Sequence, residues 1–281
     1  MASAPKTYDD YINHPYFTNE YNIQKMVEEY KQHKIQRDGV YSYSGYPSVT
    51  SVLGMMDPQK DFILGRWRQS LVKKGLDPEK VVDNYAKVGT VIHYSILSRV
   101  SPVEIEPPMW KIEEYPDRCE ELTINGVKQW KLLIEGDEPQ LKIESPICEQ
   151  YYRNDKEKFC GIYDLYANIN GKKTLADLKT SPKCRDSYFL QLGAYSMFFD
   201  TMPEQGMIIN VCPDERNLGY IKNKQMKPVV SSINQSEMFE YRKQWREMIR
   251  AWHTLFDEHL PIVESNKKCG PPIRSENQIV K

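Results

Sequence analysis

The chain has 281 residues, of which 40% are hydrophobic and 27% are charged, values typical of a globular protein long enough to bury a core. The 38 basic and 39 acidic residues give a net charge of −1, which excludes a generally basic nucleic-acid-binding domain but leaves room for a local basic groove. No apolar run approaches the length of a membrane span, and residues 1–17 lack the apolar core of a secretory signal. These features predict no membrane partner and a cytoplasmic location, which includes the interior of a bacterium or a virus-infected cell.

The cysteines do not form a metal-binding pattern. None is part of a C-x-x-C pair, so neither a zinc site nor an iron–sulfur cluster is expected, and free thiols are the default. The six positions are Cys119, Cys148, Cys160, Cys184, Cys212 and Cys269.

The N-terminal third of the chain reads as helical. Ser48 or Thr50 is well placed to cap the start of a helix, and the segment 127–136 fits a helix or a strand. Residues 101–140 are acidic and interrupted by prolines, and the segments 104–110 and 113–122 predict loops. Apolar spacing predicts further helices over residues 22–36, 61–75 and 83–100.

After residue 140 the pattern changes to alternating segments that are typical of strands. We expect an α/β fold with a central mixed β-sheet flanked by helices and preceded by a helical region. The predicted division is a helical region over 1–140, a core over 141–260 and a flexible tail over 261–281. Strands are predicted over 145–154, 159–169, 172–180, 206–214 and 218–226, and helices over 185–199 and 235–260.

A hairpin is predicted where Asn170-Gly171 separates two alternating segments, because this dipeptide favours a two-residue turn. Counting back from the turn makes Asp164 and Asp177 direct cross-strand neighbours, with Lys179 on the same face as Asp177. The other face would carry apolar residues, namely Tyr163, Leu165, Ala167, Ala176 and Leu178.

Two opposed carboxylates destabilise a hairpin unless something compensates their charge. One interpretation is a solvated strand pair. The other is a divalent cation between Asp164 and Asp177, for which oxygen ligands favour Mg²⁺, with Mn²⁺ as a substitute. Lys179 beside such a cation could orient water or offset negative charge on a phosphate.

Three segments in this order resemble a known superfamily. The motifs "GIYD", "DLK" and "QLGAY" resemble those of the PD-(D/E)xK nucleases in the RecB-like branch. The resemblance implies that Asp164 and Asp177 bind the metal and that Lys179 is catalytic. It also implies that Gln191 and Tyr195, four apart on one helix face, support the catalytic group.

Upstream motifs extend the resemblance over roughly residues 45–258. "VGTVIHYSIL" resembles the helix that supplies a histidine ligand, here His93, and "SPICEQYY" resembles the strand with an extra glutamate, here Glu149. Glu144 competes for that second role. "YPSVTSVL" is similar to a segment of the mitochondrial genome maintenance exonuclease family. The ordinary alternatives are a packed histidine and a surface glutamate.

DNA contacts are predicted in two places. Thr180, Ser181 and Lys183 follow the "DLK" strand and could donate to a phosphate. A segment that mixes basic residues with an aromatic one suits single-stranded DNA, although a solvated helix face explains its charges as well. It contains Arg66, Trp67, Arg68 and Lys73.

The resemblance therefore implies a metal-dependent deoxyribonuclease. We expect an exonuclease that hydrolyses phosphodiester bonds in single-stranded DNA or at DNA ends. The alternatives are a structure-selective endonuclease on the same fold and a non-catalytic DNA-binding scaffold.

Overall fold

In the computed structural model, residues 5–36, 46–58, 60–108, 118–135, 137–181, 184–211 and 227–260 are described. The predicted strand over 218–226 and the tail over 261–281 lie outside these residues, and the division at residue 140 stays a prediction. The helices are α1 (Tyr8–Ile12), α2 (Glu20–Gln36), α3 (Val49–Met55), α4 (Lys60–Val72), α5 (Pro78–Val100), α6 (Cys119–Ile134), α7 (Asp186–Tyr195) and α8 (Gln235–Phe256).

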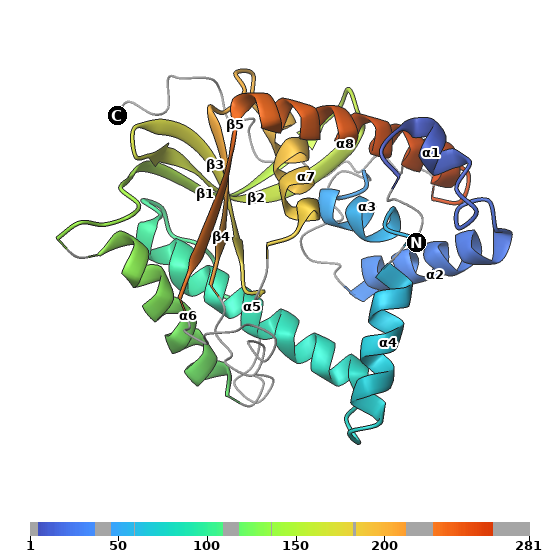
Figure 1. Cartoon of the computed structure of the whole chain (residues 1–281), viewed down its shortest axis with the longest axis horizontal. Coiled ribbons are helices and arrows are strands. Elements are labelled where there is room, and N and C mark those ends of the chain that lie inside the picture. Colours follow the sequence, from blue (N-terminus) through green and yellow to red (C-terminus); the bar gives the residue numbers. More distant parts are fainter. Residues whose placement is uncertain are drawn as a thin grey trace.

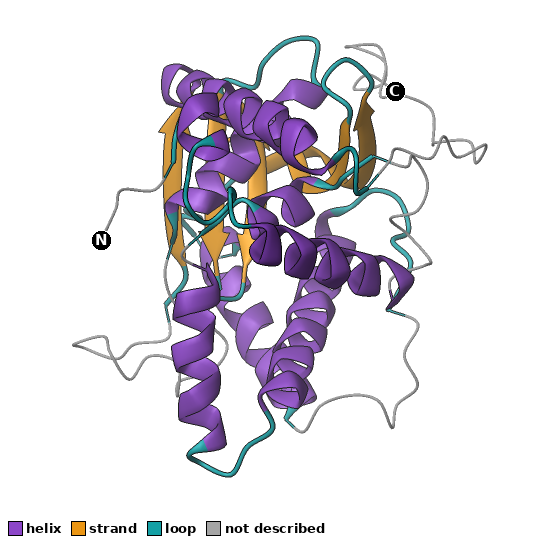
Figure 2. Ribbon diagram, turned by 90° about the vertical axis from the view of Figure 1, so that its right-hand side faces the viewer, coloured by secondary structure: helices purple, strands orange, loops and turns teal. Residues whose placement is uncertain are grey.

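The fold is α/β, as predicted, with a mixed sheet in the order β1-β2-β3-β4-β5 and helices on both faces (Figures 1 and 2). Neighbouring strands are antiparallel except β3 and β4, which are parallel and are connected through α7. The strands are β1 (Ile143–Asn154), β2 (Phe159–Ile169), β3 (Lys172–Lys179), β4 (Gln205–Asn210) and β5 (Val229–Asn234).

Two hydrophobic cores hold these layers together. The α7–α8 core joins one face of the sheet to α1, α2, α3, α7 and α8, and includes Leu175, Leu192 and Trp245. The α5–α6 core lies on the other face and includes Ile92 and Trp130. Trp130 belongs to α6, so the segment that fitted either a helix or a strand is a helix packed on the sheet.

The predicted caps and turns explain several element boundaries. Ser48 caps α3 by accepting a hydrogen bond from the backbone of Ser51, as one of the two predicted candidates. Asn234 and Glu237 form a capping box at the start of α8. Asn170 and Gly171 both have positive φ angles, as the tight β2–β3 turn requires.

The segment around α3 is joined to the sheet. The backbone N–H of Cys160 in β2 donates to the carbonyl of Pro47 at 3.0 Å, and Ser48 and Cys160 form an isolated parallel bridge. Val49 and Val52 are fully buried in the α7–α8 core. This part of the helical region therefore completes the core beside β2.

The helix α4 and the beginning of α5 extend away from the sheet, whereas the rest of α5 packs on it (Figures 1 and 2). Several apolar side chains near the turn between them are exposed, including Val72, Leu76 and Tyr85. Among the described residues, no helix has both the length and the apolar character that a membrane crossing requires.

Candidate metal centre

Asp164 lies where β2 and β3 separate. The ladder between these strands runs from Ile169–Lys172 to Leu165–Ala176, in the predicted register. It ends there, and the backbone N–H of Leu178 donates instead to Asp164 Oδ2 at 2.7 Å. The expectation that Asp164 and Asp177 are directly paired is therefore wrong, because a side-chain acceptor replaces the backbone acceptor at the next step.

The strict alternation of β2 is broken at the same position. Tyr163 packs in the α7–α8 core, with its ring centroid 5.3 Å from that of Phe199, whereas Leu165 packs in the α5–α6 core. The predicted single apolar face is thus wrong for Tyr163. On the adjacent strand, Glu149 has a φ of 51°, a left-handed conformation that is uncommon for a non-glycine residue. The local change in both strands brings Glu149 and Asp164 to the same group of side chains.

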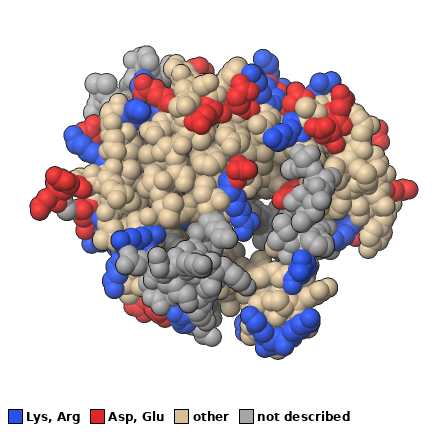
Figure 3. Space-filling model, in the orientation of Figure 1, with Lys and Arg blue, Asp and Glu red and all other residues tan. Residues whose placement is uncertain are grey.

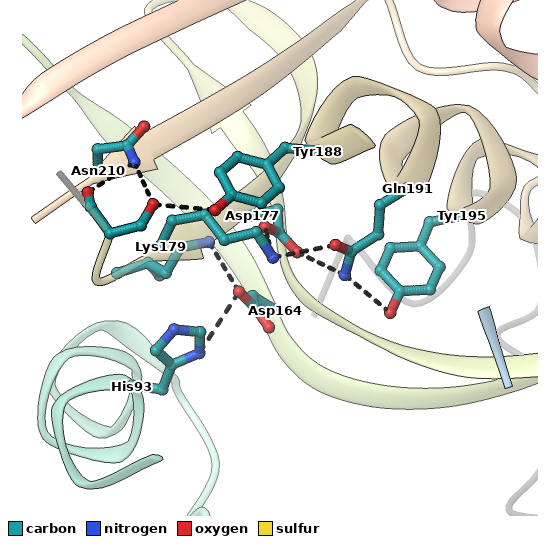
Figure 4. A network of polar contacts seen from close by, with 10 residues as sticks. His93, Asp164, Asp177, Lys179, Tyr188, Gln191, Tyr195 and Asn210 are labelled. Carbon is teal, nitrogen blue, oxygen red and sulfur yellow. Dashed lines mark hydrogen bonds and ion pairs between the residues drawn. The ribbon is translucent and has the colours of Figure 1, made fainter. Parts of the chain in front are cut away.

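His93 reaches these acids from α5 (Figure 4). Its Nδ1 atom lies 3.5 Å from Asp164 Oδ2. One turn earlier, a Cβ atom on Gly89 would lie 3.3 Å from Thr180 Oγ1, so the small residue allows α5 to pass close to the end of β3. The spacing Gly89-x-x-x-His93 thus accommodates the close approach of the helix.

One ligand atom from each of His93, Glu149 and Asp164 lies within 4.8 Å of the other two. A Mg²⁺-sized ion with ligand distances of about 2.1 Å spans at most about 4.2 Å between opposite ligands, so small side-chain movements are enough to close the group. Two carboxylates suit Mg²⁺ and Mn²⁺, and an imidazole nitrogen is a ligand for transition metals. These residues fit a divalent cation of this class.

Glu144 does not join this group. Its carboxylate is exposed and forms an ion pair with Lys142 at 2.7 Å, so Glu149 is the glutamate of β1 that lies beside His93.

Asp177 has a different set of partners. Its Oδ2 atom lies 2.5 Å from Lys179 Nζ, and its Oδ1 atom accepts from Gln191 Nε2 at 3.0 Å. Gln191 Oε1 accepts from Lys179 Nζ at 3.0 Å, and its Nε2 also donates to Tyr195 at 3.1 Å. The structure therefore brings Asp177, Lys179, Gln191 and Tyr195 into one network, beside His93 and Asp164 (Figure 4). Glu149 belongs to the same group as these last two residues.

The acids of the centre hold protons more tightly than free carboxyls do. Burial, followed by the charge of Asp164 and then that of Asp177, raises the pKa of Glu149 to about 8. Burial raises the pKa of Asp164 to about 6 against the opposing effect of Lys179, and it does the same for Asp177. A bound cation would favour the ionised carboxylates and so lower their pKa values again.

The two basic groups respond in opposite directions. Burial and the nearby Lys179 charge lower the pKa of His93 to about 4, which leaves its imidazole neutral and able to act as a ligand at neutral pH. Burial disfavours the charged form of Lys179, but Asp177 and Asp164 outweigh it and raise its pKa. Lys179 therefore stays an ammonium.

The predicted DNA-binding residues after β3 lie next to this network. The Thr180 side chain faces Gly89 of α5, and Ser181 Oγ accepts from the hydroxyl of Tyr188 at 3.0 Å. Lys183 lies outside the described residues. Contacts of Thr180 and Ser181 with DNA stay a prediction.

The other predicted DNA-binding residues belong to α4, except Lys73, which directly follows this helix. Arg66, Arg68 and Lys73 are exposed and Trp67 is half-buried, while Arg68 pairs with Glu79 at 3.1 Å. Lys and Arg side chains gather at the projecting end of α4 and α5 (Figure 3). These residues form a surface separate from the metal centre.

Asn210 was missed by the sequence prediction. It ends β4 opposite Lys179, is buried, and donates through Nδ2 to Ser181 at both the carbonyl oxygen and Oγ. The ends of parallel strands meet at one edge of a sheet, so expecting β3 and β4 to be parallel would have pointed to this residue.

No protein-family model and no curated protein matches this chain. Among solved structures, one titled "Crystal structure of SSO0001" is 15% identical, covers 81% of this chain and 85% of its own, and has a TM-score of 0.29. A similarity of this size carries no argument about function.

Proposed function

We propose that the protein is a metal-dependent deoxyribonuclease of the PD-(D/E)xK superfamily, acting as an exonuclease on single-stranded DNA or DNA ends. The observation that carries the proposal is the adjacency of two unlike groups. His93, Glu149 and Asp164 offer ligands for a cation, and Lys179 presents an ammonium beside them. Positive charge placed next to the reacting phosphate stabilises the negative charge that develops during hydrolysis of a phosphodiester, and both a cation and an ammonium supply it.

The three residues of the ligand group offer two kinds of ligand atom. Asp164 and Glu149 supply carboxylate oxygens, and neutral His93 supplies a nitrogen. A divalent cation bound there would polarise a phosphate oxygen and lower the pKa of a water molecule. Asp177 is proposed as a further ligand, because a carboxylate has lone pairs beyond those that Lys179 and Gln191 engage.

Lys179 acts as a charge rather than as a base. Its raised pKa keeps the ammonium protonated at neutral pH, so it donates hydrogen bonds and offsets charge that develops on the phosphate. Gln191 holds both Lys179 and Asp177, and Tyr195 holds Gln191. This arrangement fixes the ammonium before DNA binds.

The basic surface of α4 is proposed to bind the DNA strand. Arg66 and Lys73 would neutralise phosphates, and Trp67 offers a ring on which a base can stack. Its separation from the metal centre suits a substrate that spans several nucleotides.

The test is digestion of end-labelled single-stranded DNA with Mg²⁺ or Mn²⁺ by the wild type, Lys179→Ala and the matched control Lys172→Ala. Lys172 is an exposed lysine on the same strand. We expect degradation by the wild type and the control, and none by Lys179→Ala. Equal activity of the wild type and Lys179→Ala would remove Lys179 from the mechanism.

Closed circular DNA separates the alternatives. An exonuclease leaves circles intact, whereas nicking of circles would identify an endonuclease. If the protein binds DNA but does not degrade it, whichever divalent cation is present, the result would support the non-catalytic scaffold and contradict the proposal.

A further inference from the structure

The ammonium of Lys179 lies in a pocket with three sides. Asp177 and Gln191 form two of them. The third is the ring of Tyr188, whose centroid lies 4.9 Å from Lys179 Nζ, within the range of a cation–π contact. A lysine side chain has four flexible carbons, so contacts from three directions restrict it far more than two do.

The orientation of the Tyr188 ring is fixed from its far end. The Tyr188 hydroxyl donates to Ser181 Oγ at 3.0 Å, and Asn210 Nδ2 donates to the same oxygen at 3.2 Å. Asn210 also donates to the Ser181 carbonyl at 3.1 Å, which ties the chain leaving β3 to the end of β4 (Figure 4). Tyr188, Ser181 and Asn210 therefore form a chain of contacts that ends at Lys179.

The burial of these residues shows where the chain is anchored. Asn210 is 3% exposed, whereas Ser181 and Tyr188 are half-buried. Tyr188, Gln191 and Tyr195 lie at positions i, i+3 and i+7 of α7, so one helix face supplies two sides of the pocket and the support for one of them.

We propose that Tyr188, Ser181 and Asn210 are positioning residues that confine the Lys179 ammonium beside the metal centre. Asn210 fixes Ser181, Ser181 fixes the plane of the Tyr188 ring, and the ring closes the pocket. The assignment of a catalytic role to Lys179 rests on the proposed function, but its confinement does not.

The test is the rate at which acetic anhydride acetylates Lys179, measured by peptide mass spectrometry relative to exposed Lys172 in the same molecule. Confinement slows the reaction of an amine with a reagent in solution. We expect Tyr188→Leu to raise the relative rate at least about fivefold, because it removes one side of the pocket. Tyr188→Phe keeps the ring and loses only its anchor, so a smaller rise is expected.

Ser181 provides the second pair of variants. Ser181→Ala removes the oxygen shared by Tyr188 and Asn210 and should raise the rate about as much as Tyr188→Phe. Ser181→Thr keeps the hydroxyl and should restore the wild-type rate. Phe189→Leu is the control, since Phe189 lies on the same helix but stacks on Tyr241 at a centroid distance of 5.8 Å.

Two results would overturn the proposal. One is a wild-type labelling rate in Tyr188→Leu. The other is an equal increase in Phe189→Leu, which would mean general loosening of α7. Labelling needs no substrate or metal, so it stands even if the protein cleaves no DNA. If it does cleave DNA, Tyr188→Leu should lower kcat with KM unchanged, as expected for a misplaced catalytic ammonium.

Discussion

The two aspartates of the hairpin lie close together in sequence and have opposite surroundings. Asp177 already has a cation, because Lys179 lies at one oxygen and Gln191 donates to the other. Asp164 has a backbone N–H, a neutral histidine and a second carboxyl, from Glu149. Asp177 is therefore in direct contact with the Lys179 ammonium, whereas Lys179 acts on Asp164 through its charge. Burial raises the pKa of both aspartates to about 6, but the Asp164 side also contains Glu149, whose pKa is raised to about 8, so an ion from solution is expected to bind there. The two aspartates of the hairpin are thus suited to different tasks. Asp177 holds the Lys179 ammonium, and Asp164 can bind a cation from solution.

The largest expected effect comes from breaking the Asp164 side. Asp164→Asn should reduce turnover by about 10²–10³-fold or more and abolish Mn²⁺ binding measured by calorimetry without DNA. Asp177→Asn should reduce turnover to a similar degree but weaken Mn²⁺ binding only about tenfold, because its main partners are Lys179 and Gln191. Equal loss of Mn²⁺ affinity in both variants would mean that Asp164 and Asp177 contribute equally to metal binding, against this prediction.

The next effect is on stability and its pH dependence. Folding raises the pKa of Asp164 from 3.8 to about 6 and that of Glu149 from 4.5 to about 8. The folded protein therefore holds protons that the unfolded chain has lost, and Asp177 adds to this effect. His93, whose pKa folding lowers to about 4, acts in the opposite direction below about pH 6.5, but the acids outweigh it, so the free energy of unfolding without metal falls as pH rises from about 4 to 8. Bound Mn²⁺ favours the ionised acids and should raise Tm more at pH 8 than at pH 5. At 100 times Kd the metal adds about 2.7 kcal/mol to the free energy of unfolding.

Glu149→Gln tests by mutation whether the raised pKa of Glu149 lowers stability without metal. At pH 8 this variant should have a higher Tm than the wild type without metal and a weaker response to Mn²⁺ in thermal unfolding. Glu144→Gln is the control, because Glu144 is exposed on the same strand and pairs with Lys142. A metal response in Glu149→Gln as large as in the wild type would exclude Glu149 as a ligand.

Gly161→Ala should disturb only the network of Asp177, Lys179, Gln191 and Tyr195. A Cβ atom at this position would lie 2.7 Å from Tyr195 Cε1, and Tyr195 is buried and stacked on Phe198. The variant should lose about 1–3 kcal/mol of stability in denaturant unfolding and lower kcat, while Mn²⁺ affinity stays near the wild-type value. Gly65→Ala is the control, since nothing lies within 4 Å of the added atom.

The smallest expected effect comes from the basic surface at α4, which supplies no side chain to the metal centre. Lys73→Glu, directly after α4, should weaken binding of single-stranded DNA by about three- to tenfold at low salt and reduce the salt dependence of binding, with Mn²⁺ affinity unchanged. Lys243→Glu tests the specificity of this effect, because Lys243 is a similarly exposed lysine on α8. If both variants bind DNA equally well in a titration, α4 does not contact the strand.

The sequence predicted those parts of the fold that depend on local patterns. Asn170-Gly171 set the register of β2 and β3, and apolar spacing located α5, α7 and α8. It missed α1, which is five residues long, and β5 over Val229–Asn234, a short segment that pairs with β4 at the edge of the sheet.

The errors near the metal centre have a physical cause. Alternation predicts that Tyr163 and Leu165 share a face, but Asp164 uses its own oxygen to accept a backbone N–H, and regular pairing stops. The left-handed Glu149 is likewise invisible to a pattern with period two. Asn210 joins the network only because a parallel strand, distant in sequence, ends beside Lys179.

The bridge between Ser48 and Cys160 has a practical consequence for fragment reconstitution. A recombinant piece restricted to residues 141–260 would lack Val49 and Val52 on one face of the sheet and Ile92 and Trp130 on the other, leaving apolar surfaces on both faces open to self-association. Supplying residues 5–135 as a separate polypeptide would cover both faces, so the two pieces should be soluble together under conditions in which residues 141–260 alone precipitate.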